Sequence, residues 1–281
     1  MQFFRDMADN PLLKTGLLAG LLASLACGVI GPYVITRRIV FLSGAIAHVA
    51  VGGIGAALFL QTVSPYWFGW FEPFYGAILS ALLAAILIGL IHDRVAERMD
   101  TLIGALWALG MAVGILLVKF TPRYTELMSY LFGNITYVGW GDVRMMALLD
   151  AVIVATVLVF HKRLLAVCLD EQQAQLQGIN VLATNIVLLC LVALTVILLT
   201  QVVGLILVIA LVSLPAATAA HHVHRMGSNV AVATALCAFL TTVPRIAVYG
   251  TRVSPESAIV LAAAGVYLLS VAVRHAAQIL R

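Results

Sequence analysis

The stretch TGLLAGLLASLACGVIGPYVI, residues 15–35, decides the class of this protein. It contains no charged residue, and it ends just before Arg37 and Arg38. A helix needs about 20 predominantly apolar residues to cross the hydrocarbon core of a bilayer. A cleaved signal peptide would have a shorter apolar region followed by a small-residue cleavage site, which is missing from its usual place. Residues 15–35 are therefore predicted to form a retained membrane span.

Similar apolar stretches recur along the whole chain. They lie at residues 40–60, 74–91, 101–120, 143–160, 181–200, 202–220, 229–249 and 255–274. The 281 residues are 63% hydrophobic and 10% charged, whereas about a quarter of the residues in soluble domains are charged. We expect an all-α, polytopic transmembrane bundle of about eight or nine spans, with residues 1–281 forming a single domain. The connection at Thr200–Gly204 is so short that eight spans and one half-inserted segment is an alternative.

The basic residues predict an orientation for the bundle. One set of alternate connections is the more basic, and it carries Arg37, Arg38, Arg94, Arg98, Lys162, Arg163, Arg225, Arg274 and Arg281. Because basic loops stay in the cytoplasm, we expect the N-terminus outside and the C-terminus in the cytoplasm. The aromatic run at residues 66–71 then falls at the outer interface. The net charge of +4 is spread over these connections, which favours contact with membrane lipid and gives no sign of nucleic acid binding.

The most informative polar residue inside a predicted span is His48. Gly44, His48 and Gly52 are spaced by four, so they share one helix face. Ionisable groups within a membrane face protein or water, and a neutral imidazole is a common ligand of zinc and similar metals. His48 is thus a candidate metal ligand; the alternative is a packing histidine bonded to a neighbouring backbone group.

Other polar residues suggest further parts of a pathway. Glu126 lies on the predicted outer side, where it could receive a cation or be an ordinary surface acid, and Asp150 lies inside the fifth span. On the cytoplasmic side, His221, His222 and His224 could bind metal at an exit or form a polar turn. Between the fifth and sixth spans, residues 169–181 predict a short helix that a partner could contact. Its candidate residues are Asp170, Glu171, Gln172, Ala174 and Gly178, the last suited to ending the helix.

Several catalytic motifs are missing from the sequence. It contains no GxxxxGK[ST] loop for ATP, no HExxH zinc-protease motif and no GxSxG nucleophile elbow. We therefore do not expect an enzyme with its own ATPase site.

Four segments together resemble the membrane permease subunit of bacterial ABC-type zinc/manganese/iron importers. They are residues 34–48 (VITRRIVFLSGAIAH), 100–104 (DTLIG), 127–134 (LMSYLFGN) and 203–219 (VGLILVIALVSLPAATA). The resemblance implies a fold similar to the vitamin B12 and siderophore importer permeases. It also implies that the permease lies in the bacterial inner membrane as a homodimer, with the translocation path at the dimer interface. Its implied partners are a cytoplasmic ABC ATPase dimer and an extracytoplasmic metal-binding protein. Residues 169–181 resemble the ATPase-coupling segment, and His48 resembles a histidine that binds the transported metal.

The chain departs from the family pattern at one position. The acid that usually stands three residues before this histidine is Ala45 here. Losing that oxygen ligand favours zinc over manganese or iron, because imidazole suits zinc while manganese prefers oxygen. Asp150 or a backbone carbonyl could supply the oxygen instead.

Rival functions are a manganese or iron importer, a metal-chelate (siderophore-type) permease, a proton- or sodium-driven secondary carrier that would rely on Asp150, and a membrane scaffold. No permanently bound cofactor is expected; the metal is cargo.

Overall fold

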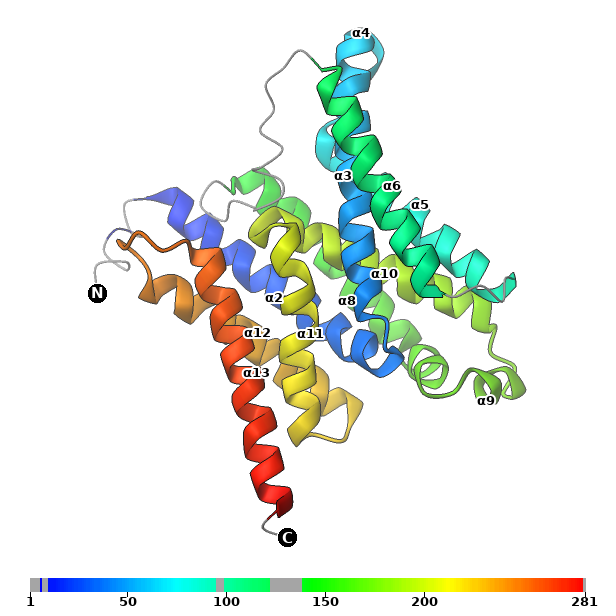
Figure 1. Ribbon diagram of the computed structural model, residues 1–281, viewed down its shortest axis with the longest axis vertical. Helices are drawn as coiled ribbons and strands as arrows, with labels where there is room; N and C mark the ends of the chain where they lie inside the picture. Colours follow the sequence, from blue (N-terminus) through cyan, green and yellow to red (C-terminus); the bar gives the residue numbers. More distant parts are fainter. Residues whose placement is uncertain (1–5, 7–9, 95–98, 122–137, 280–281) are drawn as a thin grey trace.

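The protein is built from helices in every part that the computed structural model describes, namely residue 6 and residues 10–94, 99–121 and 138–279 (Figure 1). The helices are α2 (Pro11–Arg37), α3 (Val40–Val63), α4 (Pro65–Phe68), α5 (Pro73–Arg94), α6 (Met99–Lys119), α8 (Trp140–Leu169), α9 (Glu171–Leu176), α10 (Val181–Val203), α11 (Leu205–His222), α12 (Met226–Ala247) and α13 (Pro255–Ile279). Every predicted apolar stretch is recovered as a helix.

Helix α2 is the centre of the bundle. It begins at a proline in the first turn, capped by Asn10, whose side-chain oxygen accepts a hydrogen bond from the amide of Leu12 at 3.0 Å. It packs against α8, α10, α11 and α12, and its Ile30 and Tyr33 are fully buried. It ends where Arg38 takes a left-handed conformation, φ +61°, which turns the chain into α3. The end of α2 and the start of α3 are thus joined by a tight turn.

Helix α3 packs closely on α5 and α6 because glycines meet across both contacts. A Cβ atom placed on Gly53 would come within 2.1 Å of the Gly76 carbonyl oxygen of α5. On Gly55 it would come within 2.6 Å of the Gly114 carbonyl oxygen of α6. Small residues allow membrane helices to approach to backbone contact. This packing fixes the position of His48, which lies on the same helix.

Eight of the described helices are long and apolar enough to cross a membrane. Helix α11 is shorter than these eight: its 18 residues rise about 27 Å, near the lower limit for a spanning helix. It is joined to α10 through Gly204, which is buried and has φ +76°. The segment for which the sequence allowed half-insertion is therefore the helix that falls short of the length of the other eight.

The two ends of the bundle carry different connections. Successive long helices alternate in direction, so the last residues of α2, α8, α11 and α13 lie toward the end where α9 lies (Figure 1). We call this the α9 end. The aromatic side chains of Tyr66, Trp67 and Trp70 are exposed at the opposite end, around α4.

Helix α6 is the least covered of the spans. Only 6% of its most apolar stretch is buried, against 72% for α2 and α3. It packs mainly on α3, with a minor contact to α5. Its remaining face carries exposed apolar side chains such as Leu109 and Leu116.

Candidate functional site

His48 lies on α3 and is held by two contacts. Its Nδ1 atom is 2.8 Å from the carbonyl oxygen of Gly44, one turn earlier. A carbonyl oxygen only accepts hydrogen bonds, so Nδ1 must carry the proton and Nε2 of the neutral ring keeps its lone pair. The ring stacks on Trp107 of α6, with centroids 4.3 Å apart and planes at 28°. His48 is half-buried, so it is oriented but not enclosed.

This arrangement is the one that metal-binding histidines commonly adopt. A ligating imidazole usually donates its second N–H to a carbonyl or carboxylate, which fixes the tautomer and the ring orientation. The backbone bond predicted as an alternative to metal binding is therefore present, but it leaves Nε2 able to bind an ion. Ala45, on the preceding turn, is buried and offers no oxygen.

Asp150 lies on α8 and is 2% exposed. Neither of its carboxylate oxygens has a hydrogen-bond partner within the described part of the chain. Helix α8 packs on α2 and α10, whereas His48 lies on α3 and stacks on Trp107 of α6. The described residues also contain no group of three His, Cys, Asp or Glu side chains that could hold a metal. The structure thus places the two predicted ligands among different helices, and Glu126 lies outside the described residues, as does the semi-polar stretch around it.

Trp107 is the residue that sequence reasoning missed. Tryptophan in membrane proteins concentrates at the two interfaces, whereas Trp107 stands well inside the predicted span 101–120. That unusual depth was the available signal. What the sequence could not supply was its partner, because residues 48 and 107 belong to different spans.

The predicted short helix is present as α9. Asp170 caps it, accepting hydrogen bonds from the amides of Gln172 at 2.9 Å and Gln173 at 3.0 Å. Ala174 is buried, and Gly178 follows the helix with φ +77°, a conformation suited to glycine. Leu176 projects outward and is 89% exposed. The helix therefore presents glutamines and one leucine to the surroundings while Ala174 holds it against the bundle.

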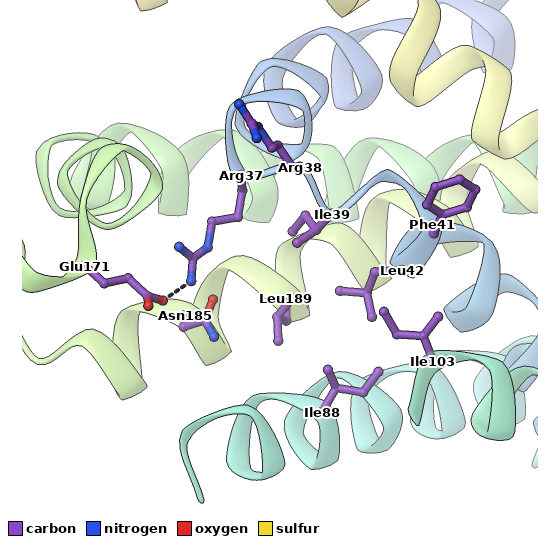
Figure 2. Close-up of a pocket in the computed structure, with 10 residues that line it drawn as sticks. All are labelled: Arg37, Arg38, Ile39, Phe41, Leu42, Ile88, Ile103, Glu171, Asn185 and Leu189. Carbon is purple, nitrogen blue, oxygen red and sulfur yellow. Dashed lines mark hydrogen bonds and ion pairs between the residues drawn. The ribbon is translucent and has the colours of Figure 1, made fainter. Parts of the chain in front are cut away.

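An ion pair links α9 to the end of α2 (Figure 2). Arg37 binds the carboxylate of Glu171 through Nη2, and its Nη1 donates to the Val167 carbonyl oxygen at 3.3 Å. Arg38 and Asn185 lie beside this pair. A pocket of about 260 Å³ opens below, walled by apolar side chains of α3, α5, α6 and α10: Leu42, Ile88, Ile103 and Leu189. The pair connects the segment predicted to contact a partner with the turn that leads into α3.

The three predicted exit histidines differ in their surroundings. His221 Nδ1 and His222 Nε2 both lie near the hydroxyl oxygen of Ser270 on α13, at 2.9 and 3.0 Å. His221 also lies over the ring of Tyr267, with centroids 5.7 Å apart. His224 lies beyond the end of α11 and is exposed. The structure therefore brings two of the three together, around a serine that the sequence did not single out.

A family match covers almost all of these elements. The model of the ABC 3 transport family matches residues 9–274. The chain belongs to the ABC 3 transport family. The resemblance seen in the four sequence segments is thereby confirmed, and the chain is a membrane permease of the ABC type.

Relatives and solved structures extend the match. A Chlamydia muridarum protein named as a metal transport system membrane protein is 41% identical, with 82% of this chain and 79% of the relative aligned. The manganese transport system membrane protein of Listeria monocytogenes is 27% identical, over 96% of this chain and 93% of the relative. A chain of the PsaBC complex from Streptococcus pneumoniae, solved with a Fab, superposes with TM-score 0.83 at 29% identity, covering 96% and 94% of the two chains.

The predicted fold is also confirmed. A chain from the structure of a metal-chelate type ABC transporter in an inward-facing conformation matches with TM-score 0.69 at 16% identity, over 92% of this chain and 85% of the other. At that identity the likeness concerns the fold alone. The family members are membrane subunits, and the ATPase of an ABC transporter is a separate subunit.

Proposed function

We propose that this permease passes a divalent transition-metal ion, with zinc preferred, across the bacterial inner membrane. Membership of the ABC 3 transport family supports an ATP-driven importer, and relatives named for metal transport support a metal as cargo. Of the rival functions, a proton- or sodium-driven carrier would need membrane carboxylates, for which Asp150 is the candidate, and membership of the ABC 3 transport family disfavours it.

The observation that carries the proposal is the geometry of His48. Its Nδ1 is anchored on the Gly44 carbonyl and its ring on Trp107, so Nε2 is presented as a lone-pair donor in a fixed direction. Imidazole is a preferred ligand of zinc, whereas manganese favours carboxylate and carbonyl oxygen. Ala45, three residues before His48 on α3, has no side-chain oxygen that could join His48 as a metal ligand. His48 therefore favours zinc.

A complete path requires a second copy of the chain. Helix α6, which His48 contacts through Trp107, is the least covered span in each chain. Pairing two copies across its exposed face would bring a His48 from each toward a common axis. Two imidazoles with water as the remaining ligands hold an ion long enough to orient it but weakly enough to release it.

Transport then proceeds by alternating access between the two ends of the bundle. A cytoplasmic ABC ATPase dimer contacts α9 of each copy, and an extracytoplasmic metal-binding protein delivers the ion at the opposite end. This assigns the α9 end to the cytoplasm, with the N-terminus outside. Motion of α9 reaches α3 through Glu171, Arg37 and the tight turn at Arg38, so the helix that carries His48 moves with the ATPase.

The test is metal uptake into proteoliposomes that contain the permease with its ATPase, compared for zinc, manganese, iron and cobalt. We expect zinc to be taken up with the lowest KM, and we expect His48→Ala to abolish uptake at limiting zinc. Ser80→Ala on α5, whose hydroxyl bonds within its own helix, serves as the matched control. Unchanged zinc uptake by the His48 variant would remove His48 from the path.

Manganese is the second candidate. Relatives at 27–28% identity, from Listeria monocytogenes and Streptococcus gordonii, are named for manganese transport. If manganese is the cargo, the same assay gives the lowest KM for manganese, and its oxygen ligands must come from a residue other than position 45. Introducing the missing acid, Ala45→Asp, discriminates between the candidates, because a zinc permease should gain manganese uptake from it.

A further inference from the structure

Two adjacent histidines converge on one hydroxyl at the α9 end of the bundle. His221 Nδ1 and His222 Nε2 lie 2.9 and 3.0 Å from Ser270 Oγ. Ser270 is buried on α13, while His222 is exposed and His221 half-buried at the end of α11. The three polar atoms therefore lie at the edge of the α11–α13 contact, within reach of the surrounding solution.

The spacing of these atoms fits a metal ion as well as it fits hydrogen bonds. A serine hydroxyl has one proton, so it can donate to only one of the two rings, and the other ring must donate its N–H to the oxygen. Two ligand atoms that each lie about 2.1 Å from one ion are about 3.0 Å apart at the right angle of an octahedral site, and about 3.4 Å apart at the tetrahedral angle usual for zinc. The distances from His221 Nδ1 and His222 Nε2 to Ser270 Oγ, 2.9 and 3.0 Å, match the right-angle value. An ion can replace the two shared protons once both rings turn so that their nitrogen lone pairs point past Ser270 Oγ.

We propose that His221, His222 and Ser270 form a second metal site, which binds a zinc-like divalent ion between α11 and α13. Two imidazole nitrogens favour zinc, cobalt or nickel over manganese and magnesium. The tilted contact between the His221 and Tyr267 rings restrains one imidazole, which lowers the cost of ordering it on binding. Water completes the coordination on the exposed side.

The site is weak by construction. It offers three protein ligands, one of them a neutral hydroxyl. The positive charge of Arg274 is felt at His221 and repels a cation bound there. The site therefore fills only when free metal is abundant at the α9 end. When filled, it links α11 to α13 by coordination bonds in place of hydrogen bonds.

Zinc binding to the purified permease–ATPase complex tests the proposal, measured by equilibrium dialysis with radioactive zinc. All variants carry His48→Gln, so that the ligand assigned to the transport path contributes nothing. We expect this parent to bind zinc between α11 and α13. Adding both His221→Gln and His222→Gln should weaken that binding at least tenfold. Ser270→Ala keeps both imidazoles and should weaken it less. His224→Gln is the matched control and should bind as the parent does.

Three results would overturn the proposal. The parent could bind no zinc, the double variant could bind as tightly as the parent, or His224→Gln could weaken binding as much as the pair, which would indicate a loose histidine patch. Elution of each variant as an intact complex in gel filtration excludes unfolding as the cause of lost binding. Because the site is scored without His48, failure of the transport proposal leaves this result unaffected, and the converse also holds.

Discussion

At the scale of single residues, Trp107 has the most direct effect on the proposed metal ligand. Its ring stacks on His48, and aromatic contacts of this kind contribute about 0.5–1.5 kcal/mol. Replacing Trp107 by Leu should therefore raise the KM for the transported metal about two- to tenfold, with a smaller change in kcat. Trp107→Phe keeps an aromatic face and should recover much of the loss. Equal KM values for the Leu and Phe variants would show that the stack does not position His48.

The contrast between Trp107 and Ala45 shows what one sequence can yield at this scale. The candidate role of His48 and the missing acid at position 45 follow from helix periodicity and from the family pattern, and both need only local information. The Trp107 stack and the Ser270 contact join residues 59 and 48 or 49 positions apart, between different spans. No local pattern encodes such pairs. Asp150 illustrates the same limit, because the sequence placed it inside a span but could not tell which helices surround it.

At the scale of elements, the link between α9 and α2 predicts how coupling fails. Glu171 is partly exposed, so its ion pair with Arg37 adds at most about 1 kcal/mol to stability. The role expected of the pair is to transmit motion of α9 to α2. Arg37→Glu and Glu171→Arg, made singly, place like charges together and should lower the metal transported per ATP hydrolysed while ATP hydrolysis itself continues. The double exchange restores the pair and should recover part of the coupling. Recovery is partial because the bond from Arg37 to the Val167 carbonyl is lost.

The control for this exchange is Arg163→Glu, at the same end of α8, where Phe160 is the ring beneath the guanidinium. It lowers the net charge as Arg37→Glu does, and it leaves both members of the Arg37–Glu171 pair in place. If the double exchange couples no better than either single variant, the ion pair does not carry motion between α9 and α2. If Arg163→Glu lowers coupling as far as the single variants do, the effect is one of overall charge at that end.

At the scale of the whole molecule, length and hydropathy were enough to predict the bundle. Each apolar stretch of about 20 residues became a helix, because a membrane leaves the backbone no other partner for its hydrogen bonds. The order in which the helices pack was not predictable, because lipid-facing and protein-facing positions are equally apolar. Thus α2 and α6 have similar mean hydropathy, yet α2 is the buried centre of the bundle and α6 lies at its edge.

The exposed edge at α6 gives the prediction for the assembled transporter. Leu109 on α6 is 61% exposed and lies close in sequence to Trp107, while Leu158 is 73% exposed and lies on α8, which packs on α2 and α10. Lipid alone would treat the two positions alike. If two copies meet across α6, Leu109→Cys in a background without the four native cysteines should form a disulfide-linked dimer on mild oxidation. Leu158→Cys, at a position that is even more exposed, should remain monomeric on a denaturing gel. Cross-linking at Leu158 but not at Leu109 would move the interface, and with it the path, away from His48.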